Sequence, residues 1–474
     1  MYKYKSMEEV LSLQNHKLRD MIQNKVAHFH PFYREMFEKM KIDPQDIHSV
    51  NDLEKLPFTT KEDLIKSPKS FILQPSKDTI KATTSFPTKL KWVLMGKEKV
   101  KELISAKYRP SFFTATSGRT SNSTPVLFTK ADLTMFKSIY AKNARIAGIS
   151  SEDKFISLFP YAPHLAFWIV YFATEEMGLT GVHTGSVLGT KRQIELSERF
   201  ECNWLAGTTT YMHYFLSKAL EQGAKFKQLR GIITGGERLS DGLRQKIEGM
   251  VEQLGGKGHK CVRDGYGVVE SKLVAMECSP HSGYHVNPEV IFWECVDPKT
   301  GKNIGWDKGG DLAFSHIDGH GTILLRYLIG DQAEGGISYK KCPHCGVLIP
   351  RIIGPLGRSD EYCSSLNIAK IKGTTVNLNS LLDFLTSTDH MQEFRVIITK
   401  QNEDDPFSLD KLLIEIASKE RDHNKLIKQI RDEVKSLTEI SPEIIVRDKD
   451  DIAADLIEGS LKGNRIVDLR KKRK

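Results

Sequence analysis

Residues 112–129 read FFTATSGRTSNSTPVLFT, a hydroxyl-rich turn between two apolar runs that each have the composition of a strand. Around Gly118 the turn carries Thr114, Thr116, Ser117, Thr120, Ser121, Ser123 and Thr124. Side-chain hydroxyls and freely turning backbone N–H groups are what a phosphate-binding loop needs. The alternative is an ordinary Ser/Thr loop on the surface, and the rest of the chain has to decide between the two.

The segments after this loop alternate between helices and strands. Residues 130–147 predict a helix, 155–159 a buried strand, and 165–177 an aromatic-rich helix. Two later segments, 204–209 and 229–237, each read as a strand that breaks into a Gly/Thr turn before a helix. This alternation predicts an α/β domain whose site lies at the carboxyl ends of the strands.

The flanking regions have other patterns. Ser6 and Glu9 form a capping box that predicts an N-terminal helix, whereas residues 75–110 show no clean period and read as an insertion or irregular linker. From residue 289 the pattern is hairpin-like and predicts a small barrel or sheet. Beyond residue 360 we expect a compact α+β unit, with a strand at 394–399 and an amphipathic helix at 408–420. The predicted domains are therefore residues 1–359 and 360–474.

Composition is that of a soluble globular protein. The 474 residues are 39% hydrophobic and 27% charged, so two or more domains are expected. No apolar run is long enough to span a bilayer, the N-terminus lacks a secretory core, and the seven cysteines form no obvious disulfide framework. We therefore expect a cytoplasmic location. The net charge of +9 favours a phosphate-rich ligand or serves solubility, and the basic end at 470–474 reads as a solvated tail.

The order of the motifs along nearly the whole chain resembles the adenylate-forming superfamily, and within it the phenylacetate–coenzyme A ligase family. The resemblance rests on residues 30–33 (HPFY), 56–64 (LPFTTKEDL), 116–120 (TSGRT), 235–237 (GGE), 264–267 (DGYG), 330–331 (GD), 357–360 (GRSD) and 465–470 (RIVDLR). It implies a large N-terminal domain of β-sheets and helices with a β-barrel-like part, followed by a smaller mobile α+β domain.

The resemblance also implies site residues. Thr116, Ser117, Gly118 and Thr120 would hold the phosphates of ATP, and Gly235, Gly236, Glu237, Asp264, Gly265, Tyr266 and Gly267 would form the adenine and magnesium motifs. Glu270 suits Mg²⁺ as a hard oxygen ligand, Tyr266 offers a flat face to adenine, and Asp331 can accept ribose hydroxyls. Arg358 is expected near the same nucleotide, Lys462 as the catalytic lysine, and Asp360 as the hinge about which the C-terminal domain turns.

Each of these roles has a structural alternative. Glu270 is also a typical helix-start acid, Asp331 a typical turn residue, and Lys462 a typical solvated surface lysine. The phosphate loop departs from the family pattern, because residues 121–124 (SNST) stand where a second glycine and a lysine are usual. The candidate acyl pocket consists of Tyr161, His164, Phe167, Gly207 and Thr208, although Phe167 fits plain core packing as well.

Cys342 and Cys345 have the spacing of half a structural zinc site. Cys278 and His285 are the nearest further Cys/His pair in the sequence, and some members of the resembled family bind zinc through three cysteines and a histidine. His281 and His344 compete for the histidine position. A closed site of this kind would be structural.

These features predict an ATP-dependent, AMP-forming ligase that joins an aromatic or other hydrophobic carboxylic acid to coenzyme A. The expected cofactors and cosubstrates are ATP, Mg²⁺ and coenzyme A, with a structural Zn²⁺. An enzyme that uses an amine or a carrier protein as acceptor, and a non-catalytic nucleotide-binding homologue, are the alternatives. We do not expect nucleic acid as a partner of the ligase, whereas a homodimer is compatible with the resemblance.

Overall fold

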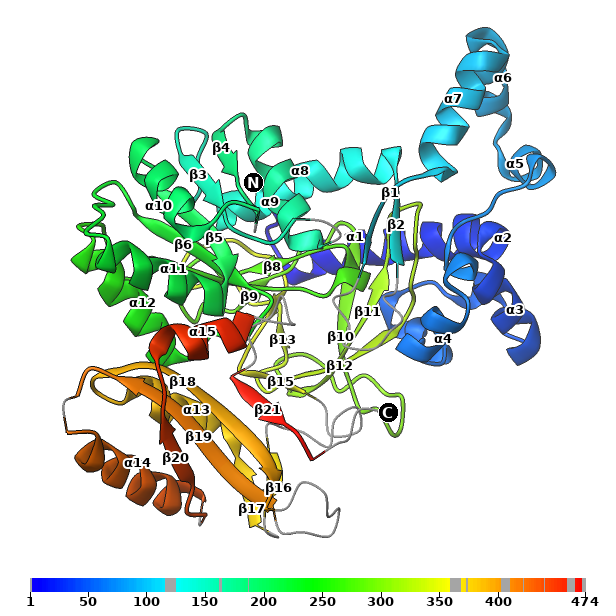
Figure 1. Cartoon of the computed structure of the whole chain (residues 1–474). Helices are drawn as coiled ribbons and strands as arrows, with labels where there is room; N and C mark the ends of the chain where they lie inside the picture. Colours follow the sequence, from blue (N-terminus) through cyan, green and yellow to red (C-terminus); the bar gives the residue numbers. More distant parts are fainter. Residues whose placement is uncertain are drawn as a thin grey trace. The chain divides into compact units, whose positions relative to one another are not determined.

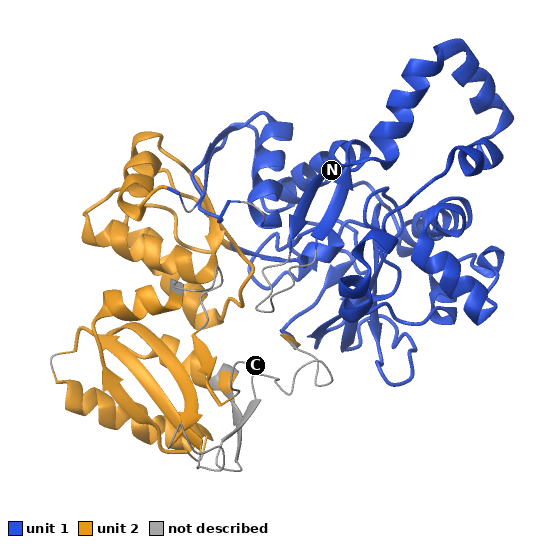
Figure 2. Cartoon of the chain, turned by 45° about the vertical axis from the view of Figure 1, so that its right-hand side comes forward, with its two compact units in different colours: residues 1–187, 263–356 blue, residues 188–262, 357–474 orange. Residues whose placement is uncertain are grey.

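The protein is described by a computed structural model that covers residues 2–115, 125–161, 164–185, 187–358, 368–371, 374–401, 410–420, 422–438, 440–457 and 465–470. The chain forms two compact units (Figure 2). The first contains residues 1–187 and 263–356, and the second contains residues 188–262 and 357–474. These units differ from the two domains expected from the sequence, so the boundary at 359/360 stays a prediction.

The first unit begins with the predicted N-terminal helix, α1 (Met7–Asp20). Half of the predicted capping box is formed: the Glu9 N–H donates to Ser6 Oγ at 3.3 Å. The Glu9 side chain accepts instead the N–H of Lys5, one residue before the N-cap, at 2.8 Å. Short helical segments follow, namely a π-helical turn (Met21–Val26), α2 (Ala27–Phe29), α3 (Pro31–Met40), α4 (Lys61–Lys66) and 3₁₀ turns at Pro44–Asp46, Val50–Lys55 and Pro68–Phe71.

Residues 77–108 form three helices, α5 (Lys77–Thr83), α6 (Phe86–Met95) and α7 (Lys97–Tyr108). The interpretation of 75–110 as an irregular linker was therefore wrong. Its mixed charges hid the helical period because α6 and α7 project from the rest of the unit, as both views show (Figure 1, Figure 2).

The hydroxyl-rich stretch connects two antiparallel strands, β1 (Pro110–Ala115) and β2 (Pro125–Thr129). The chain passes directly from β2 into α8 (Lys130–Ile146), the helix predicted at 130–147. Parallel strands β3 (Lys154–Ser157) and β4 (Thr180–His183) then flank α9 (Leu165–Met177), which has its predicted bounds.

Antiparallel β structure completes the first unit. Strands β10 (Ile291–Val296), β11 (Gly310–His316) and β12 (Tyr327–Ala333) pair in order, which confirms the hairpin-like pattern expected after residue 289. Short strands pair in the order β7 (Val262–Tyr266), β8 (Ala275–Met276), β9 (Tyr284–His285), β14 (Arg351–Ile352), β13 (Ile337–Ser338). The 3₁₀ turn Val269–Ser271 lies between β7 and β8.

The second unit starts with alternating helices and strands: α10 (Thr190–Arg199), β5 (Trp204–Thr208), α11 (Thr209–Glu221), β6 (Gly231–Gly235) and α12 (Asp241–Gln253). β5 and β6 are parallel, with Thr208 opposite Gly235. Both strands predicted at 204–209 and 229–237 are thus confirmed. Because parallel neighbours end at the same edge of a sheet, the two Gly/Thr turns lie next to each other.

The C-terminal part is an α+β unit, as expected. A sheet of order β20 (Glu443–Val446), β19 (Asp410–Ser418), β18 (Met391–Lys400), β21 (Ile466–Asp468) packs with α13 (Leu378–Ser387) and α14 (His423–Thr438). The remaining elements are α15 (Lys449–Ile457), the hairpin of β16 (Ile368–Ile371) and β17 (Thr374–Asn377), and β15 (Leu356–Arg358) where the chain leaves the first unit.

One element of this part contradicts the sequence interpretation. Residues 410–418 form strand β19, not part of an amphipathic helix at 408–420. The buried residues Leu412, Ile414 and Ile416 stand two positions apart, as residues on one face of a strand do. Pairing along the whole length of β18 decides this structure. In the part of the chain that the structure describes, no helix is long and apolar enough to cross a membrane.

Candidate functional site

Two residues predicted to bind the nucleotide lie in contact in the first unit. Tyr266 ends β7 and Asp331 lies on β12, and the Tyr266 hydroxyl donates to Asp331 Oδ2 at 2.8 Å. The Tyr266 ring lies 5.9 Å from that of Tyr284 and 6.1 Å from that of Trp293. These contacts hold the Tyr266 ring and the Asp331 carboxylate in place. The ring offers a flat aromatic face, and the carboxylate can accept several hydrogen bonds. Residues 65 positions apart thus form one polar pair.

Glu270 is buried on the 3₁₀ turn that follows β7. Its Oε1 accepts a hydrogen bond of 3.3 Å from the hydroxyl of Tyr327, which is itself buried at the start of β12. Asp331 stands four residues further along the same strand. The expected magnesium ligand and the expected ribose ligand are therefore both positioned by β7 and β12.

The backbone of the 264–267 motif is also tightly determined. Asp264 is buried, accepts a hydrogen bond from the Tyr284 hydroxyl at 2.8 Å and donates its N–H to Glu277 Oε2 at 2.9 Å. A Cβ on Gly267 would lie 2.5 Å from the carbonyl oxygen of Leu273, so that only glycine fits there. Asp264 and Gly265 lie within β7.

In the second unit, the predicted Gly/Thr residues cluster at one edge of the β5–β6 pair. Gly207 and Thr208 end β5, and Gly235 and Gly236 follow at the end of β6. Glu237 then accepts the N–H of Thr210 through Oε2 at 2.7 Å, and so satisfies a free donor at the start of α11. The edge thus presents small residues and backbone groups, as a nucleotide or acyl group would require.

The aromatic half of the predicted acyl pocket lies in the first unit. The half-exposed Tyr161 contacts the buried Phe167 edge to face, with ring centroids 5.1 Å apart, and His164 occupies the N-cap position of α9. Phe167 also lies 6.0 Å from the ring of His183. Core packing therefore accounts for Phe167, while Tyr161 keeps an exposed face.

Several predicted residues lie outside the described parts of the chain. They are Thr116, Ser117, Gly118 and Thr120 of the phosphate loop, the hinge Asp360 and the catalytic Lys462. The structure gives only the backbone of Arg358, the last residue of β15.

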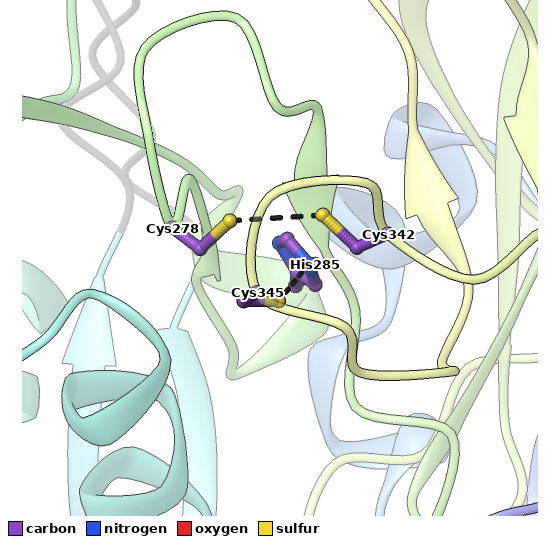
Figure 3. Close-up of side chains that lie close together, drawn as sticks. All are labelled: Cys278, His285, Cys342 and Cys345. Carbon is purple, nitrogen blue, oxygen red and sulfur yellow. Dashed lines mark hydrogen bonds between the residues drawn. The ribbon is translucent and has the colours of Figure 1, made fainter.

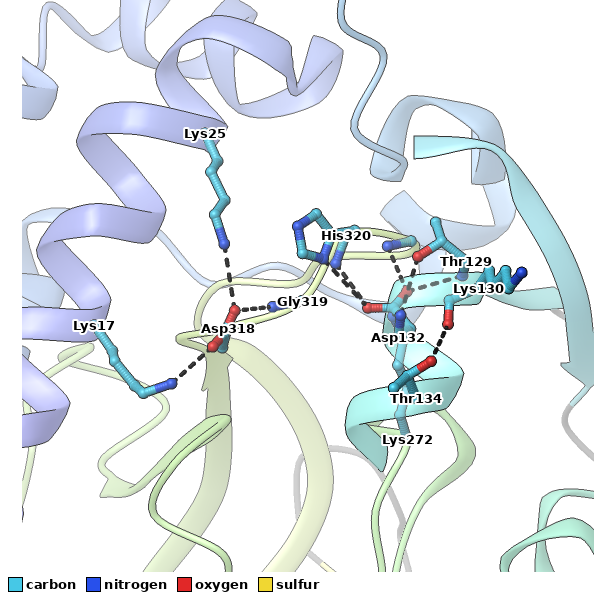
Figure 4. A network of polar contacts seen from close by, with 11 residues as sticks. Lys17, Lys25, Thr129, Lys130, Asp132, Thr134, Lys272, Asp318, Gly319 and His320 are labelled. Atoms are coloured by element: carbon cyan, nitrogen blue, oxygen red, sulfur yellow. Dashed lines mark hydrogen bonds and ion pairs between the residues drawn. The ribbon is translucent and has the colours of Figure 1, made fainter. Parts of the chain in front are cut away.

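A buried ion pair anchors the strand that leaves the phosphate loop. Asp132 is at the third position of α8, and its carboxylate accepts N–H groups from Thr129, His320 and Gly321 at 3.0, 2.8 and 2.7 Å (Figure 4). Lys272 Nζ lies 3.6 Å from Asp132 Oδ2, and neither side chain is exposed. Burial alone would raise the pKa of Asp132, but Lys272 and the backbone N–H groups outweigh burial and lower it. The network ties the start of α8 to the β11–β12 connection.

Four side chains in the first unit converge as a metal centre would require (Figure 3). Their ligand atoms all lie within 4.8 Å of one another: Cys278, His285, Cys342 and Cys345. The Sγ atoms of Cys278 and Cys342 are 3.7 Å apart, and Cys345 Sγ is 3.3 Å from His285 Nε2. Thiolates held tetrahedrally at about 2.3 Å from one zinc ion stand roughly 3.8 Å apart, so the sulfur positions fit.

The second nitrogen of His285 supports the same assignment. Its Nδ1 lies 3.1 Å from the carbonyl oxygen of Met276, so Nδ1 carries the proton and Nε2 faces the cysteines as a ligand. Among the described residues the group includes His285, and neither His281 nor His344. The structure therefore brings together the four residues predicted from the sequence, which come from three separate segments.

Comparison with known proteins places the fold and these motifs in a family. The AMP-binding enzyme family matches residues 38–315, more than half of the chain. The chain belongs to the AMP-binding enzyme family. A phenylacetate–coenzyme A ligase of Escherichia coli is 24% identical over 456 residues, which cover 93% of this chain and 91% of that protein. The same-named protein of Thermus thermophilus is 25% identical over 359 residues, with 75% and 71% covered.

Solved structures show the same fold. A structure of 2-hydroxyisobutyryl-CoA ligase in the postadenylation state, in complex with R3-HIB-AMP, matches with a TM-score of 0.75 at 17% identity, covering 98% of this chain and 90% of that one. These findings confirm the resemblance to the adenylate-forming, phenylacetate–coenzyme A ligase-like family and the expected fold class.

Sequence reasoning about this AMP-binding enzyme missed three residues that support the site. Tyr327 was not among the predicted site residues, although its hydroxyl donates a hydrogen bond to Glu270. Asp132 carried a signal, since Thr129 and Asp132 have the spacing of a capping box. No signal in the sequence pointed to Lys272, because a lysine is normally expected at the protein surface.

Proposed function

We propose that this AMP-binding enzyme is an ATP-dependent ligase that activates an aromatic or other hydrophobic carboxylic acid and transfers the acyl group to coenzyme A. The alignment with the E. coli phenylacetate–coenzyme A ligase over 93% of the chain carries this proposal. The contact between Tyr266 and Asp331 supports it, since the two residues belong to different nucleotide motifs.

The reaction has two steps. A carboxylate oxygen of the acid attacks the α-phosphorus of ATP, the bond to the bridging oxygen breaks, and pyrophosphate leaves. The thiol of coenzyme A then loses its proton and attacks the acyl carbonyl carbon, and AMP leaves with the electrons of the acyl–oxygen bond. The first step makes the carboxylate oxygen part of a good leaving group, which the second step uses.

The proposed roles follow the chemistry of each side chain. Asp331 accepts the ribose hydroxyls while Tyr266 packs against adenine, and Gly235, Gly236 and Glu237 belong to the proposed adenine motif. Glu270 holds Mg²⁺, which supplies positive charge to the phosphates. Thr116, Ser117, Gly118 and Thr120 bind the phosphates, and Lys462 offsets the negative charge that develops in the first step. Asp360 is the proposed hinge and Arg358 a proposed nucleotide contact.

The acyl group is proposed to lie among Tyr161, His164, Phe167, Gly207 and Thr208. The exposed face of Tyr161 supports an aromatic or apolar acid. We also propose a structural Zn²⁺ held by Cys278, His285, Cys342 and Cys345, since three sulfurs and an imidazole nitrogen are a zinc ligand set. A cytoplasmic location and a homodimer remain predictions from the sequence.

The test is pyrophosphate release from ATP and Mg²⁺ across a panel of aryl and fatty acids, with and without coenzyme A. We expect acid-dependent release that falls about 100-fold or more in Lys462→Ala, since removal of one donor to developing charge costs that much. Lys340→Ala, at a highly exposed lysine, is the matched control and should retain activity.

The outcomes separate the competing functions. AMP release that depends on coenzyme A supports the ligase. AMP release that needs an amine or a carrier protein instead would identify another acceptor. ATP binding without pyrophosphate release for any acid would refute the enzyme and favour a non-catalytic nucleotide-binding protein.

A further inference from the structure

The helical arm formed by α5, α6 and α7, residues 77–108, exposes large apolar side chains. On α6 the exposed fractions are 78% for Phe86, 56% for Leu90, 77% for Val93 and 82% for Leu94. These four residues have the spacing i, i+4, i+7, i+8, which places them on one face of the helix. None of the residues of α5, α6 or α7 is fully buried.

The opposite face of α6 packs against α7. Trp92 and Met95 are half-buried, and α6 contacts α7 as the second helix of a hairpin. The exposed apolar face is therefore not needed to hold the hairpin together. A contiguous apolar surface of this kind on a projecting element marks a site of interaction.

Positive charge surrounds that face. Residues 77–109 contain nine Lys or Arg and three Asp or Glu, so this short segment has a formal net charge of +6 (9 − 3). The whole chain of 474 residues has a formal net charge of only +9. Lys89 and Lys91 flank the apolar face on α6 itself, and both are exposed. An apolar face bordered by lysines is the composition of helices that lie in the interface of an anionic membrane.

The charge also argues against the other occupants. Two arms that met face to face would bring two strongly positive surfaces together, which like-charge repulsion disfavours. An anionic bilayer satisfies both features at once, since acyl chains receive Phe86, Leu90, Val93 and Leu94 while headgroups pair with the lysines.

We propose that the arm docks the enzyme on the surface of an anionic phospholipid bilayer, with the exposed face of α6 inserted at the level of the headgroups. This is peripheral binding, which requires no membrane-spanning helix. It is independent of the reaction proposed above.

The test is sedimentation of the full-length protein with vesicles of phosphatidylcholine alone and of phosphatidylcholine mixed with phosphatidylglycerol. We expect binding to the mixed vesicles, weakened by salt because charge contributes to it. Leu90→Glu/Leu94→Glu should lower the binding constant by at least about tenfold, since it removes apolar contact and adds negative charge. Lys89→Gln/Lys91→Gln should weaken binding to the mixed vesicles alone.

Leu437→Glu is the matched control, because Leu437 is 47% exposed on α14, outside the arm. It should bind as the wild type does. The variants at Lys89, Leu90, Lys91, Leu94 and Leu437 change exposed side chains, so their circular dichroism and melting temperatures should equal those of the wild type.

Trp92 provides a local readout. Brominated acyl chains should quench the fluorescence of the wild type more than that of Trp92→Phe. Binding that survives Leu90→Glu/Leu94→Glu, or that Leu437→Glu abolishes equally, would overturn the proposal. A second outcome would also overturn the proposal: the wild type binds no vesicles, forms a dimer in sedimentation velocity, and the dimer is lost in Leu90→Glu/Leu94→Glu. A second copy of the chain would then cover the apolar face.

Discussion

Replacing Lys272 by methionine should destabilise the protein by about 3 kcal/mol, through the charge that it leaves behind on Asp132. The two groups are 3.6 Å apart and neither is exposed. At an effective dielectric constant near 20, their attraction is on the order of 4–5 kcal/mol. Removing one partner of a buried pair typically costs about 3–5 kcal/mol. The lower end applies because three backbone N–H groups still bind Asp132 in the variant.

Asp132→Asn should cost at least as much. Among the described residues, Lys272 Nζ has no hydrogen-bond partner within 3.5 Å, and the Asp132 carboxylate at 3.6 Å is its ion-pair partner (Figure 4). The double variant Asp132→Asn/Lys272→Met buries no unpaired charge. Its loss should therefore be smaller than the sum of the two single losses, by about 2 kcal/mol or more.

The assay is scanning calorimetry combined with urea unfolding of the four proteins. A loss of about 3 kcal/mol corresponds to a shift in melting temperature on the order of 6 °C for a large domain. Lys340→Met is the control, because Lys340 pairs with Asp307 at the surface and its loss should cost less than about 1 kcal/mol. If the two single losses add to within about 0.5 kcal/mol in the double variant, the buried pair is not coupled and the reasoning is refuted.

Three further predictions concern the metal centre, acid stability and the nucleotide pair. The purified protein should contain zinc by elemental analysis, and Cys345→Ser should lower the zinc content and the melting temperature; wild-type protein without zinc would contradict the assignment of the site. Burial lowers the pKa of His30 to about 3, against about 6.5 in an unfolded chain. The unfolded state therefore takes up the proton first as the pH falls. As a result, the free energy of unfolding should decrease as the pH falls from about 6.5 toward 3. His30→Gln should flatten this dependence in urea unfolding at several pH values, and an equal slope in both proteins would show that His30 stays out of the transition. Tyr266→Phe removes the hydroxyl that binds Asp331 and should raise the KM for ATP several-fold with a smaller change in kcat, whereas an unchanged KM would mean that this contact does not position the nucleotide site.

The helices with strong local signals were predictable from the sequence. α1 begins at the N-cap Ser6, α8 begins at the capping box of Thr129 and Asp132, and α9 ends at Gly178 with a positive φ. These signals work because the groups that end a helix lie within a few residues of one another. The Gly/Thr turns after β5 and β6 were found for the same reason, since strand and turn are adjacent in the chain.

Segments whose structure depends on distant partners were misjudged. β19 was taken for part of a helix because its apolar residues suit either period over a short run, and only pairing with β18 selects the strand. The arm at 77–108 was taken for an insertion or irregular linker because its many charged residues obscured the apolar face of α6, and its helices bury little surface.

For the metal centre and for the contact between Tyr266 and Asp331, the sequence predicted the residues and the tertiary structure decided which of them meet. The spacing of Cys342 and Cys345 predicted half of a zinc site, because two ligands on one turn lie close together in the sequence. Tertiary structure selected His285 over His281 and His344, since only the pairing of β9 with β8 and β14 brings its imidazole to the three sulfurs. Tyr266 and Asp331 were named from separate motifs, but the hydrogen bond between them exists because β7 and β12 fold together. Local sequence thus determined which side chains carry the chemistry, whereas packing between distant segments decided which of them meet.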